Sequence, residues 1–184
     1  MNKKQLIALT MSAVMALSLA ACGSEKPAAS SQSSSSAVSE DSGSTTQIPN
    51  PWTEYTDLAE AVQASGIPLS VPDTVEGYPQ RFIQALTGED ATLEVRYLND
   101  DGQEICIRKT DGAMDPSGDY NTYEQESSSA VGDRTVTLKG NSGRVSLAVW
   151  AENGYHYSIG AYDDSGTISG ISSEEMLALV NEVA

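Results

Sequence analysis

A series of short turns constrains how the second half of this chain can fold. Turn-forming residues recur at 99–102, 132–133, 141–143 and 153–154. Between these turns apolar and polar residues alternate, as in Leu93, Val95 and Tyr97 with Glu94 and Arg96. Alternation of this kind indicates strands with one buried face, and turns this short join antiparallel neighbours. The sequence therefore predicts a curved antiparallel sheet of about five to seven strands, placed near 81–86, 93–97, 104–108, 123–129, 134–139, 145–149 and 155–161.

A helix is expected at each end of this sheet. The first follows Trp52, with Thr53 or Thr56 as its cap and Gly66 as its stop. The second begins at a capping box formed by Ser172 and Glu175, followed by apolar residues at helical spacing. Helix, antiparallel strands and helix together predict an α+β domain over residues 49–184.

The N-terminal segment has the composition of a secretory signal. Lys3 and Lys4 precede an apolar run, 6–21, that is shorter than the roughly 20 residues that a spanning helix needs. Residues 1–21 are therefore predicted to be a signal peptide. Residues 22–48 are rich in serine and contain little that can be buried, which predicts a flexible tether.

The end of the signal resembles the lipobox of bacterial lipoproteins. The motif consists of Leu19, Ala20, Ala21 and Cys22, and Gly23 suits the position that follows. The resemblance implies that Cys22 is diacylated and becomes the first residue of the mature protein. Two acyl chains give stable anchoring in a lipid bilayer. The expected location is then the extracellular face of the cell membrane.

The charge of the chain excludes one class of partner. The sequence has 26 acidic and ten basic residues, for a net charge of −16. Removal of the signal takes away Lys3 and Lys4, so the mature net charge is about −18. Phosphate binding needs clustered Lys and Arg, so no nucleic-acid partner is expected. Solubility beside an acidic envelope is the simplest interpretation of this charge, and a cationic partner or bound metal ions are the alternative.

The sequence offers no catalytic constellation. His156 is the only histidine, and Cys106 is the only cysteine left once Cys22 is acylated. One histidine and one thiol do not supply a zinc site, which usually takes three or four such ligands. Cys106 lies in a strand pattern and is read as a packed apolar residue, although a thiol near Arg108 leaves reactivity open. No catalytic residue and no cofactor are predicted.

The loop over residues 111–121 is the candidate binding region. Its oxygen-bearing side chains are possible calcium ligands: Asp111, Asp115, Asp119 and Asn121. Tyr120 takes the position where a calcium loop of the EF-hand type has glycine, so ordinary Asx turns remain the alternative. Tyr120 and Tyr123 are the candidate ligand-binding residues, because tyrosine is common at binding surfaces.

The domain resembles bacterial domain-of-unknown-function family 4367. The resemblance lies in a helix that ends at Gly66, an extended segment from Val71 to Tyr78, and the hairpins that follow. The stretches 50–53, 104–109 and 117–121 are also similar to small lipoproteins of Gram-positive bacteria. The resemblance implies a fold and a location on the cell surface, and it carries over no catalytic residue.

Three functions are compatible with these features. A non-catalytic binding or sensing lipoprotein with an unknown protein or small-molecule ligand agrees best with the anchor, the tether and the lack of a catalytic constellation. An envelope hydrolase that uses acidic residues is one alternative. A calcium-stabilised adhesion or assembly module is the other.

Overall fold

The computed structural model describes residues 50–163 and 169–184. The predicted signal peptide 1–21 and the whole predicted tether 22–48, including Cys22, lie outside these residues. The described part is an α+β domain, as expected, with eight strands and two helices. The strands are β1 (Thr53–Tyr55), β2 (Gln80–Leu86), β3 (Thr92–Leu98), β4 (Glu104–Thr110), β5 (Gln125–Val131), β6 (Arg134–Asn141), β7 (Arg144–Glu152) and β8 (Tyr155–Tyr162).

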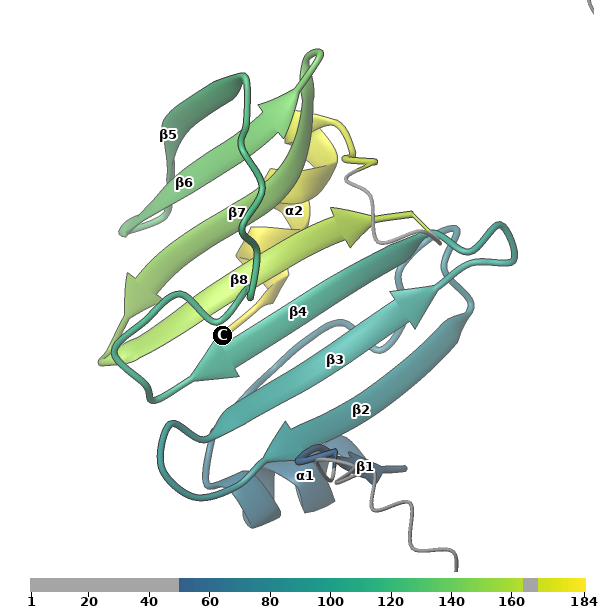
Figure 1. The fold of residues 1–184 in the computed structure, drawn as a ribbon, viewed down its shortest axis with the longest axis vertical. Helices are drawn as coiled ribbons and strands as arrows, with labels where there is room; N and C mark the ends of the chain where they lie inside the picture. Colours follow the sequence, from purple (N-terminus) through teal and green to yellow (C-terminus); the bar gives the residue numbers. More distant parts are fainter. Residues whose placement is uncertain (1–49, 164–168) are drawn as a thin grey trace, which may run out of the picture. The chain divides into compact units, whose positions relative to one another are not determined.

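All eight strands form one antiparallel sheet, in the order β1-β2-β3-β4-β8-β7-β6-β5. Two four-stranded meanders, β1–β4 and β5–β8, meet where β8 pairs with β4 (Figure 1). The connection from β4 to β5 therefore has to travel from the middle of the sheet to its edge. That connection, 111–124, carries the loop that the sequence marks as a candidate site.

The expectation of five to seven strands was wrong by one. The additional strand is β1, which was interpreted as the entry to the first helix. It has three residues, too few for alternation to show, and it forms only by pairing with β2. The predicted strand at 123–129 begins two residues later, at Gln125.

Both helices have the caps that helix physics requires. Asp57, and not Thr53 or Thr56, caps α1 (Leu58–Ser65), because its Oδ1 accepts hydrogen bonds from two backbone N–H groups. Helix α2 (Ser173–Glu182) begins with the predicted capping box. Glu175 N–H donates to Ser172 Oγ at 3.2 Å, and Ser172 N–H donates to a Glu175 carboxylate oxygen at 2.8 Å.

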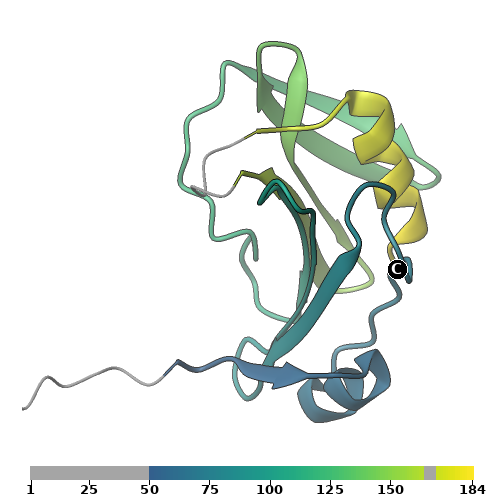
Figure 2. The ribbon, with the colours of Figure 1, turned by 90° about the vertical axis from the view of Figure 1, so that its right-hand side faces the viewer.

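One face of the sheet packs against the helices and forms the core. A row of apolar side chains crosses this face in register, from Ile83 through Val95, Ile107 and Ile159 to Ala148. Figure 2 shows both helices on the same side of the sheet and the 111–124 connection on the other. Each fully buried branched side chain contributes about 1.5–3 kcal/mol. The opposite face, called the open face here, carries no helix among the described residues.

Candidate functional site

A buried carboxylate organises the middle of the open face. Glu94 on β3 is only 1 % exposed, and it lies between two arginines. Arg108 Nε on β4 is 2.5 Å from Glu94 Oε2, and Arg96 Nε is 3.2 Å from Glu94 Oε1. Gln84 Nε2 donates to the same carboxylate at 2.5 Å, and Arg96 Nη1 reaches Glu104 Oε2 at 3.3 Å. The alternating charged residues of these strands thus form a paired network.

Arg108 also holds the candidate loop onto the open face. Its Nη1 donates to the carbonyl oxygens of Pro116 at 3.2 Å and Ser117 at 2.5 Å. Its guanidinium carbon lies 5.9 Å from the centre of the Trp52 ring. One side chain therefore connects the buried carboxylate, the loop and the N-terminal end of the domain, which makes the loop a wall fixed to the sheet.

The loop is stabilised internally by Asx turns. Ser117 N–H donates to Asp115 Oδ1 at 2.8 Å, and Asn121 N–H donates to Asp119 Oδ1 at 2.9 Å. Asn121 Nδ2 donates to the same oxygen at 2.6 Å, while the Tyr123 hydroxyl donates to the other oxygen, Asp119 Oδ2. Burial raises the pKa of Tyr123 above its ordinary value, and the hydrogen bond to Asp119 raises it further. Tyr123 is thus a support of the loop.

The four calcium candidates are not gathered around one point. Asp115 and Asp119 direct an oxygen at their own loop backbone, and the described residues include no group of three or more His, Cys, Asp or Glu side chains that could hold a metal ion. The backbone N–H of Asp111 donates a hydrogen bond to the carbonyl oxygen of Ala91, the residue just before strand β3. The calcium site therefore stays a prediction. The Asx turns, which were the alternative explanation for these Asp and Asn residues, are present in the loop.

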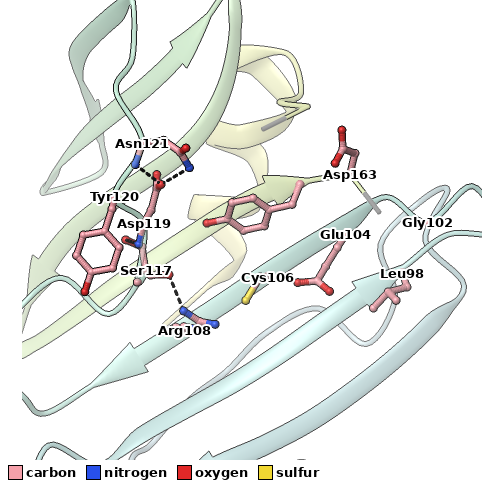
Figure 3. A pocket seen from close by; sticks show the side chains of 12 residues that line it. Leu98, Gly102, Glu104, Cys106, Arg108, Ser117, Asp119, Tyr120, Asn121 and Asp163 are labelled. Carbon is pink, nitrogen blue, oxygen red and sulfur yellow. Dashed lines mark hydrogen bonds between the residues drawn. The ribbon is translucent and has the colours of Figure 1, made fainter. Parts of the chain in front are cut away.

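A cavity of about 770 Å³ lies between the loop and the open face (Figure 3). Glu104, Cys106 and Arg108 of β4 line it from the sheet, and loop residues 117–121 line it from the other side. Tyr162 and Asp163, at the end of β8, complete the wall. Its size falls within the range of about 300–1,000 Å³ that is typical of small-molecule sites.

Tyr120 is the most exposed large side chain of the cavity. It is 97 % exposed at the outer lip and comes from the part of the loop fixed by Asp119. An aromatic ring held in water on an ordered loop has no packing role, so Tyr120 remains the sequence-derived candidate with the clearest access to a ligand.

Burial disfavours reactivity of the Cys106 thiol, although it lies at the cavity. It is buried, and burial raises its pKa well above the ordinary value, with Glu94 adding to the effect and Arg108 opposing it. A neutral, desolvated thiol is a poor nucleophile. In the cavity it therefore acts as a small apolar surface, in agreement with the packing role expected from the sequence.

Two groups of the cavity have raised pKa values that the sequence did not indicate. Burial raises the pKa of Glu104, and Arg96 offsets this only in part. Burial also raises the pKa of Tyr162, with contributions from Cys106 and Asp119. The ring of Tyr162 lies over Gly160, where a Cβ atom would collide with it. A glycine in mid-strand two residues before a tyrosine was the available signal for this arrangement.

The other tyrosines of β8 belong to the core face. The ammonium group of Lys109 contacts both rings, with its Nζ 4.5 Å from the centre of the Tyr155 ring and 4.7 Å from that of the Tyr157 ring. Lys109 is only 4 % exposed and donates a hydrogen bond to the carbonyl of Pro68. Tyr155 and Tyr157 therefore take no part in the cavity, which is lined by Tyr120 and Tyr162.

Comparison with known proteins finds no match among protein-family models, curated proteins or solved structures.

Among residues 50–163 and 169–184, neither helix has the length and apolar character needed to cross a membrane.

Proposed function

We propose that this chain is a lipid-anchored lipoprotein of the extracellular face of a bacterial membrane, related to domain-of-unknown-function family 4367. In this proposal it binds a ligand without catalysis. The observation that carries the binding role is the cavity over the open face. Its loop wall is held by Arg108 before any ligand arrives, so little conformational entropy is lost on binding.

The anchoring part of the proposal rests on the motif that ends at Cys22. The test is metabolic labelling of the full-length chain with a palmitate analogue in a bacterial host. Labelling and membrane fractionation are expected for the native chain, and both are expected to disappear in Cys22→Ala. Retention of label in Cys22→Ala would exclude this cysteine as the anchor. Cys106→Ala serves as the matched control, because a buried thiol should contribute no label.

The binding part can be tested by NMR with a library of small molecules. Ligands are expected to shift the backbone amides of Glu104, Tyr120 and Asn121, which line the cavity, and to leave those of the distant edge strand β5 unchanged. Tyr120→Ala should weaken binding. Met114→Ala is the control, because Met114 is an exposed residue of the same loop that does not line the cavity. Saturable binding that shifts only other parts of the domain would exclude the cavity as the site.

Hydrolysis by acidic residues is the second candidate function, and one observation favours it. Glu104 is a carboxyl group with a raised pKa in a cavity that also contains Asp163, and such an environment suits a general acid. Turnover of envelope glycans by the native chain, lost in Glu104→Gln with ligand affinity retained, would establish catalysis. Binding without turnover would support the non-catalytic role.

A further inference from the structure

We propose that the cavity over the open face receives an organic cation, namely an ammonium or guanidinium group carried on an apolar stem. The inference rests on the proposed binding function and adds the chemical class of the ligand. The same group can come from a free amine or from a Lys or Arg side chain of a peptide. Three properties of the cavity lead to this class: its charge, its aromatic rings and its apolar floor.

The charge of the cavity is negative. Glu104, Asp119 and Asp163 contribute carboxyl groups to its lining, and Arg108 contributes the single guanidinium group among the described lining residues. That guanidinium is already paired with Glu94 beneath the cavity, at 2.5 Å. Glu104 is itself paired with Arg96, and Asp119 accepts hydrogen bonds within the loop, but the carboxyl groups of the lining still outnumber its guanidinium group, which disfavours a phosphate or carboxylate ligand and favours a cation. The net charge of −16 for the whole chain acts in the same direction.

Two phenol rings are placed where a cation can use them. Tyr162 lies over Gly160 within the wall, and Tyr120 stands in water at the lip. Tyrosine is a neutral phenol at physiological pH, and burial raises the pKa of Tyr162 further. The face of such a ring attracts ammonium and guanidinium groups within about 6 Å of its centre.

The domain already places an ammonium group against tyrosine rings on the core face of its sheet. The Lys109 ammonium group is held there by the rings of Tyr155 and Tyr157 and by one carbonyl oxygen. In this internal site two tyrosine rings and one carbonyl oxygen contact a buried ammonium group, and the charge of Glu152 also favours its charged form. The cavity offers the same types of group, with Glu104 as the acceptor.

The floor suits the stem of the ligand. Leu98 and the largely buried Cys106 contribute apolar atoms to the lining of the cavity. A bare metal cation gains nothing from such a surface, whereas the methylene groups of an alkylamine are removed from water there. The combination therefore favours an alkylammonium or alkylguanidinium ion over an inorganic cation.

The test compares ligands of equal size and different charge on the full-length chain by isothermal titration calorimetry. The probes are butylammonium, butylguanidinium, neutral pentanamide and anionic pentanoate. Two capped tripeptides, Gly-Lys-Gly and the same peptide with an acetylated lysine, represent the peptide source. Cations are expected to bind at least about tenfold more tightly than the neutral probe and to weaken as salt is added. Tighter binding of the lysine peptide than of butylammonium would identify a peptide as the source, and the reverse would identify a free amine.

Three variants separate a specific site from general acidity. Glu104→Gln and Tyr120→Ala should each weaken cation binding by about tenfold, and Tyr120→Ala leaves the fold intact because the side chain is exposed. Glu126→Gln, which removes an exposed carboxylate of β5 outside the cavity, should leave the affinity unchanged. Equal loss in all three variants would overturn the site in favour of non-specific attraction.

The two proposals fail in different ways. Binding of pentanamide or pentanoate in the cavity with an affinity equal to that of the cations would overturn the cation inference and leave the binding function in place. Absence of saturable binding for every probe, together with an unsuccessful library screen, would overturn both.

Discussion

Arg108 Nε lies 2.5 Å from Glu94 Oε2, and this pair connects the floor of the open face to the loop that covers it. Glu94 is inaccessible to water, although it stands on a face that has no helix over it among the described residues. The guanidinium groups of Arg96 and Arg108 lie beside this buried carboxylate and offset the cost of removing it from water. The pair is therefore a structural support of the cavity.

Replacement of Glu94 by Ala should destabilise the domain by about 3 kcal/mol. The change leaves Arg108 and Arg96 without their shared partner, and removal of one member of a buried pair typically costs about 3–5 kcal/mol. The lower end applies because both arginines retain some contact with water. Urea denaturation with an unchanged m-value measures the effect. Glu126→Gln is the control, since its exposed pair with Lys139 at 4.0 Å should contribute less than about 1 kcal/mol. A similar loss in both variants would contradict the special role of Glu94.

The capping box makes a separate prediction for the C-terminal helix. Ser172→Ala removes the acceptor of the Glu175 N–H bond and should cost about 1 kcal/mol in unfolding free energy. Ser172→Asp should recover most of this loss, because aspartate is also a good cap. Thermal or chemical denaturation of the three proteins provides the comparison. Equal stability of the Ser172→Ala and Ser172→Asp proteins would show that the capping box does not stabilise α2.

Much of the fold was predictable from local sequence, and the failures share a cause. Short turns at 141–143 and 153–154 determine hairpins, and Ser172 with Glu175 determines a helix start, because each acts over a few residues. Strand β1 and the pairing of β8 with β4 depend on partners about thirty or more residues away in the chain. No local pattern contains that information.

The site was predictable only in part, for the same reason. The loop was identified from its oxygen-bearing side chains, and Tyr120 was identified because tyrosine is common at binding surfaces. Glu104 was missed because its role comes from burial beside Tyr162 on the neighbouring strand. The alternation of Glu104, Cys106 and Arg108 indicated a common face, but it did not show that the loop would enclose it.

The raised pKa of Glu104 predicts a pH-dependent stability. Burial raises this pKa above its ordinary value of 4.5, so the folded protein holds the proton more tightly than the unfolded chain does. The contribution of Glu104 to the stability of the fold is therefore complete below pH 4.5, and it is lost as the pH rises through the pKa of Glu104 in the folded protein. The melting temperature of Glu104→Gln, relative to that of the native protein, should increase between pH 4 and pH 7.

Glu175 provides a control of opposite sign. Hydrogen bonds from Ser172 lower its pKa below 4.5, so its contribution is present above that pH and is lost as pH falls through the folded pKa. The relative melting temperature of Glu175→Gln should accordingly decrease between pH 4 and pH 7. The same trend in both variants would show that burial does not control Glu104.

Gly160→Ala should displace Tyr162 without unfolding the domain. The added Cβ would collide with the end of a side chain that stands near the edge of the cavity and can rotate away. The expected cost is about 1–3 kcal/mol, with a change in the near-ultraviolet circular dichroism of tyrosine. Gly140→Ala is the contrasting variant, because there the Cβ would collide with the backbone of Arg144, which cannot move. It should be far more destabilising, and equal effects would contradict this distinction.

Lys109→Met tests whether charge or packing keeps a lysine in the core. Methionine fills a similar volume but removes the hydrogen bond to Pro68 and the attraction of the two tyrosine rings. The loss should be about 1–3 kcal/mol at pH 7. Burial lowers the pKa of Lys109 below 10.5, so the unfolded chain binds this proton more tightly and the native protein should gain further on the variant as pH rises toward 10.5. Lys139→Met should change little, because Lys139 is partly exposed and its ion-pair partner Glu126 is exposed. A variant as stable as the native chain would show that apolar packing alone holds this position, and it would remove the internal precedent for ammonium binding between tyrosines.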